Sequence, residues 1–515
     1  MVPFHAISLY HYYKAAWSFF ISTFEEHFMI PQHHYVSCVG CGTRVHAYDL
    51  ETFSCPNRDC MPNVNHVLQK KHVITQQIWQ RSKLEDSKNP FIRYRHRLLG
   101  YHRTINSNHS DIDYIEKVSR LDGALQAIDG TGFTETPLTV EPELADAIGF
   151  DPMQKLFVKN ETHNVAGSHK ARHLFGILLN LSDDALHRPF AIASCGNAAL
   201  AAAVVSKAAG AKLEVFIPTD AEESVVERLK ALGATLHICE RREGELGDPC
   251  YLRSLEAVKN GAVPFTCQGP DNGLTIEGGE TLAYELFDQW RENNQACHHM
   301  FVQVGGGALA SSSAQALAEV MRHEPLPTLP RFHTVQTRGA FPLARAYDRI
   351  VKVIDARLKG QEIPSFTPYE DDLAVGVRAA AHDVSAIEQR LIMADCIRSA
   401  WDSTAVQSAV RYAAANKPLF MWPWESAPHS IAHGILDDET YDWYAIICTM
   451  FRTGGIPLVA DEDHLKAAHD LAHSHTDITP SATGSAGLAG LMLMKEANAI
   501  ADYENACIYF TGIER

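Results

Sequence analysis

The fold is decided by the stretch Asn164-Val165-Ala166-Gly167-Ser168-His169-Lys170-Ala171-Arg172. It follows a short apolar run, LFVK at 156–159, and opens the amphipathic segment RHLFGILLNL at 172–181. This order predicts a strand, a loop and a helix. The dipole at the start of a helix disfavours a cation, so this position favours the neutral amine that Schiff-base chemistry requires. The same sequence also fits a solvated Lys170 on the first turn of a helix.

Three further loops have a comparable setting. Ser194–Ala198 follows the apolar run FAIA, Gly305–Leu309 follows MFVQV, and Thr483–Gly490 opens a helix of small residues. From Thr134 onward, short apolar runs alternate with helix-length segments, which predicts an α/β fold with open, mostly parallel sheets flanked by helices. Ligands of such sheets bind at the carboxyl ends of the strands, so a site is expected at these loops.

The backbone of two of these loops suits anions. Free N–H groups at the start of a helix can hold a carboxylate at Ser194–Ala198 and a phosphate at Gly305–Leu309. Asn197 also fits the role of a helix cap without any other function.

A dinucleotide site is a weaker interpretation of the glycine loop. Gly305, Gly307 and Ala310 match the relaxed pattern G-x-G-x-x-A. The next predicted strand ends in Gln336 and Thr337, which offer no carboxylate to a ribose hydroxyl. An oxidoreductase is therefore disfavoured.

Taken together, the four loops resemble the pyridoxal-phosphate (PLP) enzymes of the tryptophan-synthase-β fold, or fold type II. That family includes threonine synthase, the threonine and serine ammonia-lyases and cysteine synthase. The resemblance covers about Thr134 to Gly512 and includes the stretch Thr275–Thr281 between the loops. It implies two open, mostly parallel sheets and PLP as the cofactor.

The resemblance also implies roles for individual residues. Lys170 would carry the Schiff base and act as the base at the α carbon, with His169 beside the cofactor. Asn197 would face the ring hydroxyl, and Thr483 the pyridine nitrogen. The implied phosphate-binding residues are Gly305, Gly306, Gly307, Ala308 and Leu309. The implied substrate-binding residues are Ser168, Ser194, Cys195, Gly196, Asn197 and Ala198.

The implied reaction is a β- or γ-elimination or replacement on a small amino acid, in a lyase similar to threonine synthase. A neutral hydroxyl such as Thr483 at the pyridine nitrogen favours loss of a leaving group over transamination. Threonine synthases usually have phenylalanine before the lysine and aspartate after it, whereas this chain has His169 and Ala171. A threonine or serine ammonia-lyase that releases a 2-oxoacid is the alternative. A second alternative is an inactive scaffold of this fold that acts through a Cys-rich module.

That module is the N-terminal ribbon-like segment. Cys38-x2-Cys41 and Cys55-x4-Cys60 supply four thiolates at a spacing close to that of a zinc ribbon. Four sulfur ligands would make the zinc structural, and some threonine synthases resemble this chain in carrying such a ribbon. Four free thiols are the other interpretation.

A further segment near the C-terminal third leaves two interpretations open. Part of it, Ser430–Ile435, resembles a piece of the catalytic domain in the same family. The neighbouring side chains either shape a substrate pocket or belong to a loop that packs on the sheet; they are Trp422, Trp424, Glu425, Asp437 and Asp438.

We predict four parts of the chain. Residues 1–30 are an unassigned leader, 31–65 the zinc-ribbon-like module, 66–130 a helical extension and 131–515 the catalytic domain, with a smaller mobile subdomain at roughly 172–275.

The composition narrows the cellular setting and the partners. The formal net charge of -17 opposes general nucleic-acid binding, and 12 cysteines in 515 residues are too few for a secreted disulfide scaffold. No run of apolar residues is long enough to span a bilayer. We therefore expect a cytoplasmic protein, a small amino acid as substrate, no nucleic-acid or membrane partner, and a homodimer as the resemblance implies.

Overall fold

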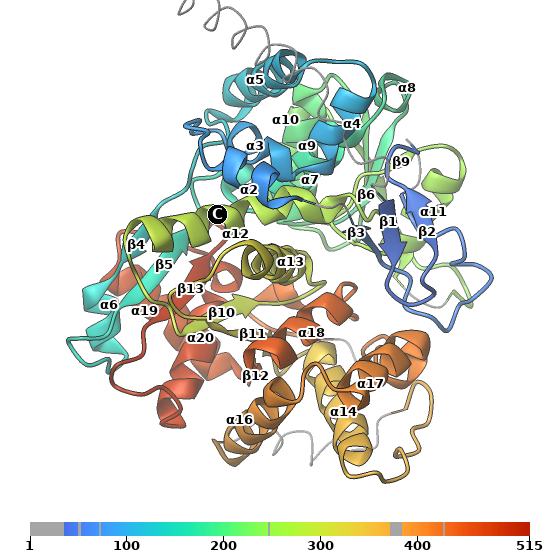
Figure 1. Cartoon of the computed structure of the whole chain (residues 1–515). Coiled ribbons are helices and arrows are strands. Elements are labelled where there is room, and N and C mark those ends of the chain that lie inside the picture. Colours follow the sequence, from blue (N-terminus) through green and yellow to red (C-terminus); the bar gives the residue numbers. More distant parts are fainter. Residues whose placement is uncertain (1–34, 50–52, 72–73, 246–247, 371–383, 426–427) are drawn as a thin grey trace, which may run out of the picture.

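The computed structural model describes residues 35–49, 53–71, 74–245, 248–370, 384–425 and 428–515. The predicted leader at 1–30 lies outside these residues. Two sheets with their helices form two lobes, and a small antiparallel sheet lies beside them (Figure 1).

The larger sheet has six strands in the order β12-β11-β10-β13-β5-β4. All neighbouring strands are parallel except β4 and β5. Both faces of β5, β10 and β13 are buried, which explains why their sequences are continuous apolar runs and do not alternate. The strands are β4 (Leu138–Val140), β5 (Leu156–Asn160), β10 (His299–Gln303), β11 (Arg331–Thr337), β12 (Pro457–Ala460) and β13 (Ala506–Phe510).

The smaller sheet has four parallel strands in the order β8-β7-β6-β9. They are β6 (Phe190–Ala193), β7 (Leu213–Ile217), β8 (Thr235–Ile238) and β9 (Val263–Pro264). Its helices include α9 (Asn197–Ala208), α10 (Glu223–Leu232) and α11 (Pro249–Lys259). The two sheets confirm the predicted fold class.

Helix α12 (Thr275–Glu292) passes between the lobes and packs on both α7 (Lys170–Asn180) and α13 (Ala308–His323) (Figure 1). The contact with α7 is made backbone to backbone. A Cβ placed on Gly278 would lie 2.0 Å from the carbonyl oxygen of Arg172, and one on Gly176 would lie 2.7 Å from the Gly278 Cα. Only glycine permits this approach, which fixes the start of α7 against α12.

The ribbon-like module is the antiparallel sheet β2-β1-β3. Its strands are β1 (Tyr35–Cys38), β2 (Arg44–His46) and β3 (Leu68–Lys71), so β3 lies beyond the boundary predicted at residue 65. The module joins the rest of the chain through hydrogen bonds from the Gly273 N–H to the Phe53 carbonyl and from the Asn65 N–H to the Ala414 carbonyl.

Other helices lie along the chain between these elements. Helix α20 packs along the strands β10 to β13, and α18 packs on β11. The helices are α2 (Gln76–Ser82), α3 (Pro90–Arg93), α4 (Leu99–Asn106), α5 (Asp111–Asp129), α6 (Pro142–Ala147), α8 (Asp183–Leu186), α14 (Pro342–Leu358), α16 (Val384–Ser399), α17 (Thr404–Ala415), α18 (Trp443–Thr453), α19 (Glu462–His475) and α20 (Ala482–Glu496).

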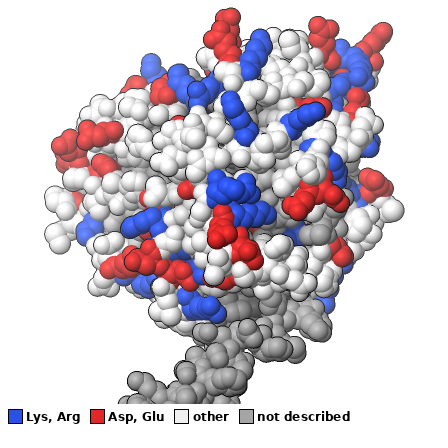
Figure 2. Space-filling model, turned by 90° about the horizontal axis from the view of Figure 1, so that it is seen from above, with Lys and Arg blue, Asp and Glu red and all other residues white. Residues whose placement is uncertain are grey.

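The surface carries charges of both signs. On the face drawn in Figure 2, Lys and Arg side chains are interspersed with Asp and Glu side chains. Among the described helices, none has the length and apolar character needed to cross a bilayer.

Candidate active site

The lysine loop is attached to the end of the central strand β13. Ser168 forms an antiparallel bridge with Gly512, and the His169 N–H donates to the Thr511 carbonyl at 3.3 Å. Lys170, the first residue of α7, is half-buried at this edge of the larger sheet. The structure therefore places the predicted lysine at the carboxyl ends of parallel strands, where ligands of such sheets bind.

Gly512 is also the point where two other predicted loops meet the lysine loop. A Cβ placed on Gly512 would lie 2.9 Å from Asn197 Nδ2, and one on Gly484 would lie 2.6 Å from the Gly512 carbonyl oxygen. Next to Gly484, the Thr483 Oγ1 accepts a hydrogen bond of 3.0 Å from the Gly434 N–H. Asn197 and Thr483 thus come to the same edge of the sheet as the lysine loop.

A fully buried ion cluster holds the helix that Lys170 begins. The Arg172 guanidinium donates to Glu161 at 2.9 Å and to Glu285 at 2.8 Å, and the Lys159 Nζ donates to Glu285 at 3.0 Å. Burial acts to raise the pKa of Glu285, but Arg172 and Lys159 lower it overall. The cluster ties together β5, α7 and α12, and so fixes the position of Lys170.

Two histidines beside Lys170 are kept neutral. Burial, reinforced by the charge of Lys170, lowers the pKa of His169 well below its ordinary value and that of His173 to about 3. Among the described residues, the two ring nitrogens of His169 and the Oγ of Ser168 have no hydrogen-bond partner. Buried polar atoms normally have partners, so these atoms are available for hydrogen bonds to a polar ligand.

The glycine loop between β10 and α13 already binds a carboxyl group of the chain. The Gly306 N–H donates to Asp437 Oδ2 at 2.7 Å. A Cβ on Gly305 would lie 2.2 Å from the same oxygen, and one on Gly306 would lie 2.9 Å from the Tyr441 ring. The absence of side chains at these positions gives an anion access to the backbone, as a phosphate cradle requires.

A second carboxylate, Asp442, lies near Lys170 and is 1% exposed. Burial raises its pKa to about 7, against the effects of the Gly269 N–H, which donates at 3.3 Å, and of Lys170. Asp442 was not among the residues predicted from the sequence, because no spacing pattern in the chain connects it to the lysine loop.

The segment for which the sequence left two interpretations divides into two groups. Asp437 reaches the glycine loop, whereas Asp438 is exposed. Trp422 and Glu425 instead pack on α14: Arg345 donates to Glu425 at 2.8 Å and stacks 3.6 Å above the Trp422 ring.

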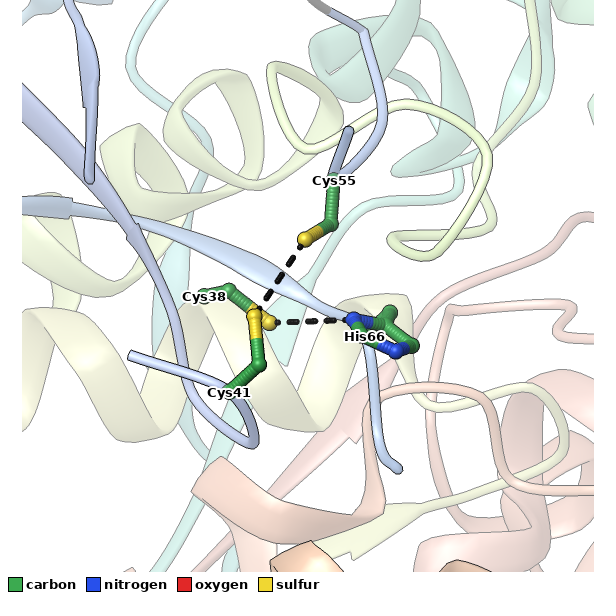
Figure 3. A group of neighbouring side chains, drawn as sticks. All are labelled: Cys38, Cys41, Cys55 and His66. Atoms are coloured by element: carbon green, nitrogen blue, oxygen red, sulfur yellow. Dashed lines mark hydrogen bonds between the residues drawn. The ribbon is translucent and has the colours of Figure 1, made fainter. Parts of the chain in front are cut away.

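The N-terminal module contains a compact group of potential metal ligands, Cys38, Cys41, Cys55 and His66 (Figure 3). Their ligand atoms all lie within 4.8 Å of one another. The Cys38 Sγ is 3.4 Å from His66 Nδ1, and the Cys41 Sγ is 3.6 Å from the Cys55 Sγ. Three thiolates and an imidazole are a complete ligand set for tetrahedral zinc.

The predicted fourth thiolate, Cys60, is not in this group and is exposed. The backbone turns at this point, with the Met61 N–H donating to the Asn57 carbonyl at 3.0 Å, and this turn carries Cys60 away from the other sulfurs. The chain then returns toward β3 and brings His66 beside Cys38. His66 was not predicted as a ligand because the second cysteine pair had already supplied four.

Comparison with known proteins identifies the family. Residues 131–419, more than half of the chain, match the family described as pyridoxal-phosphate dependent enzymes. The chain belongs to this family.

Relatives of this chain include two threonine dehydratases. The chain is 26% identical over 176 residues to the L-threonine dehydratase biosynthetic IlvA of Lactococcus lactis. The matched residues make up 34% of this chain and 41% of that protein. The chain is 24% identical over 186 residues to the threonine dehydratase 2 biosynthetic, chloroplastic, of Solanum lycopersicum. The matched residues make up 36% of this chain and 29% of that protein. The chain thus matches less than half of the length of either relative.

Solved structures share the fold of this chain. The processed threonine deaminase isoform 2 of Solanum lycopersicum superposes with a TM-score of 0.50 at 16% identity, covering 79% of this chain and 91% of that one. The threonine deaminase of T.th. gives a TM-score of 0.50 at 17% identity, covering 77% of this chain and 98% of that one.

The residues near Lys170 fit PLP in two respects. The unpaired polar atoms of Ser168 and His169 offer hydrogen bonds to a polar ligand. The glycine loop binds a carboxyl oxygen through the Gly306 N–H, as it would bind a phosphate oxygen.

Proposed function

We propose that this PLP-dependent enzyme is a carbon–oxygen lyase that acts on a small amino acid. Within that class we favour a threonine or serine ammonia-lyase, because the curated relatives described above are named threonine dehydratases. An enzyme similar to threonine synthase is the second candidate, favoured by the Cys-rich module that precedes the catalytic part. The proposal depends above all on the meeting of the Lys170, Asn197 and Thr483 loops around Gly512.

Bound PLP supplies an electron sink that stabilises negative charge at the α carbon of an amino acid. Lys170 would hold the cofactor through its amine and move the α proton. The imidazole of His169, whose pKa is lowered by burial, would lie beside the cofactor without adding a charge there. The Thr483 hydroxyl, which is also neutral, would face the ring nitrogen and favour elimination over transamination.

The substrate carboxylate would bind at the start of α9. Helix N-termini present free N–H groups and a partial positive charge to anions. Ser194, Gly196, Asn197 and Ala198 are partly exposed there and Cys195 is exposed, so a small ligand can reach the loop.

The first test is the visible absorbance spectrum of the purified full-length protein, before and after borohydride, with a peptide map of the reduced adduct. We expect a yellow band whose reduction marks Lys170. Lys170→Ala should lose this adduct and all turnover, whereas Lys207→Ala, an exposed lysine of α9, should keep both. A protein that stays colourless in added PLP would overturn the proposal and favour the inactive-scaffold alternative.

Substrate assays separate the two subclasses. Formation of a 2-oxoacid from threonine or serine supports the ammonia-lyase, and release of phosphate from phosphohomoserine supports the threonine-synthase-like enzyme. Activity on none of these three substrates would contradict both.

We also propose a structural zinc ion held by Cys38, Cys41, Cys55 and His66. With four protein ligands, zinc keeps no open position for water, so its role would be to stabilise the module. Metal analysis of the purified protein should find about one zinc per chain. Cys55→Ser should lose it, and Cys60→Ser, which changes an exposed cysteine outside the group, should retain it.

A further inference from the structure

The carboxylate of Asp437 lies where the glycine loop would hold a phosphate. Asp437 Oδ2 accepts the Gly306 N–H at 2.7 Å, and the Gly305 backbone faces the same oxygen. Backbone N–H groups of a glycine loop ahead of a helix are the donors that bind phosphate oxygens in proteins. A carboxylate oxygen and a phosphate oxygen are equivalent acceptors for such a donor.

The rest of the segment Ile435–Asp442 keeps Asp437 in this place. The Thr440 hydroxyl donates to the Gly305 carbonyl at 3.0 Å, and the Asp442 N–H donates to the Gly306 carbonyl at 3.4 Å. The segment Ile435–Asp442 therefore packs along the glycine loop on both sides of Gly306, and the contact of Asp437 is part of this packing.

Burial raises the pKa of Asp437, and the charge of Lys170 acts against this increase, as it also does for the pKa of Asp442. The two carboxyl groups and Lys170 therefore share one local environment. A phosphate that enters the loop would bring further negative charge next to Asp437, and like charges at this range repel each other. One N–H also cannot donate fully to two acceptors.

We propose that Asp437 sets the affinity of the glycine loop for the cofactor phosphate by competing for the Gly306 N–H. This inference rests on the proposed function, because it takes Gly305–Leu309 as the phosphate site. Binding of the phosphate requires the Asp437 side chain to leave the loop. Asp437 therefore weakens the binding of PLP and has little effect on pyridoxal, which has the same ring and aldehyde but no phosphate.

The test is a cofactor titration of the full-length protein after removal of bound cofactor with hydroxylamine. Absorbance reports the binding of PLP and, separately, of pyridoxal to the wild type, Asp437→Asn and Asp437→Ala. We expect Asp437→Ala to bind PLP roughly tenfold more tightly than the wild type, which is the effect of one charge-assisted contact. Asp437→Asn loses the charge but keeps an oxygen that accepts the Gly306 N–H, so its gain should be smaller, and pyridoxal affinity should be unchanged in both variants. Asp438→Asn is the matched control, since it removes an exposed neighbouring carboxylate, and it should leave both affinities unchanged.

Equal or weaker PLP binding by both Asp437 variants would overturn the inference and leave the proposed function standing. An equal gain for PLP and pyridoxal would overturn it as well, because the effect would not act through the phosphate. If neither the wild type nor the variants bind PLP or pyridoxal, the proposed function itself fails, and this inference with it. The two variants differ in size, so a folding defect in one leaves the other to decide.

Discussion

At the scale of single residues, Arg172 joins two buried carboxylates near the candidate site. Its guanidinium is the main counterion for the buried Glu161 and Glu285. Arg172→Met would leave two buried carboxylates with only Lys159 to balance them, and breaking a buried ion pair costs about 3–5 kcal/mol. We expect urea unfolding to show a loss of that size.

The matched control is Arg242→Met, which breaks an exposed pair with Glu256. Exposed pairs contribute at most about 1 kcal/mol, so this variant should unfold almost as the wild type does. Similar stability losses in the two variants would contradict the role assigned to the buried cluster.

A second prediction at this scale concerns pH and Asp442. Burial raises its pKa from 3.8 to about 7, against the Gly269 N–H and the charge of Lys170, while Asp271 adds to the increase. Between these two values the native state binds more protons than the unfolded state, so the contribution of Asp442 to stability falls as pH rises from about 4 to 7.

Asp442→Asn removes this titration. The variant should gain stability relative to the wild type as pH rises through that window, by an amount on the order of a few kcal/mol, and the gain should level off above it. Denaturant unfolding of both proteins at pH 5 and pH 8 measures it. A difference between the two proteins that is the same at both pH values would exclude Asp442 as the cause.

The residues that sequence patterns could and could not predict differ in how they reach the site. Lys170, Asn197 and Thr483 each lie next to a glycine or at the start of a helix, and the order of their loops along the chain produced the family resemblance that singled them out. Their roles remain predictions. Asp442 and His66 reach their places only through tertiary packing, because a loop distant in sequence folds back on each site. No local sequence pattern indicates that a distant loop packs against the site.

At the scale of elements, the crossing of α7 and α12 gives a prediction of backbone packing. Gly278→Ala would place a methyl group 2.0 Å from the Arg172 carbonyl oxygen, and neither backbone can move without displacing a helix. Overpacking of this kind typically costs about 1–3 kcal/mol. We expect lower thermal stability and, because α7 begins at Lys170, weaker cofactor binding.

Gly123→Ala in α5 is the control, since no atom lies within 4 Å of a Cβ built there. Replacing a helical glycine by alanine at an open position stabilises a helix by up to about 1 kcal/mol. Opposite signs for the two substitutions would confirm that close helix approach decides the outcome, whereas stabilisation in both would contradict it.

The sequence predicted the buried parallel strands but not strand β3, and the difference has a physical reason. Strands buried on both faces read as continuous apolar runs, so the alternation of runs and helices gave the parallel sheets. Strand β3, with the sequence LQKK, contains two lysines and is not an apolar run. Lys70 can lie in this strand because its ammonium pairs with the carboxylate of Glu280. The module therefore extends further along the chain than its cysteine spacing indicated.

At the scale of the whole molecule, the ribbon-like module touches the wall of the candidate site. Arg58, close in sequence to Cys55 of the proposed zinc site, donates to Asp271 at 2.5 Å, and the Phe53 carbonyl accepts from the Gly273 N–H. The wall segment 267–275 leads from β9 to α12 and also carries Gly269, which contacts Asp442. The homodimer and the cytoplasmic location remain predictions at this scale.

These contacts predict that zinc bound in the ribbon-like module limits the mobility of the wall segment 267–275. Removing the proposed zinc frees the loop that contains Cys55, and this loop supplies the contacts made by Phe53 and Arg58. The backbone amides of Gly269 and Gly273 should then exchange with deuterium faster, while those of the buried strand β10 stay protected. Hydrogen exchange with and without a chelator measures this effect, and Cys55→Ser should reproduce it without chelator. Cys60→Ser should exchange like the wild type, and unchanged exchange of the wall after metal loss would mean that the module folds independently of the candidate site.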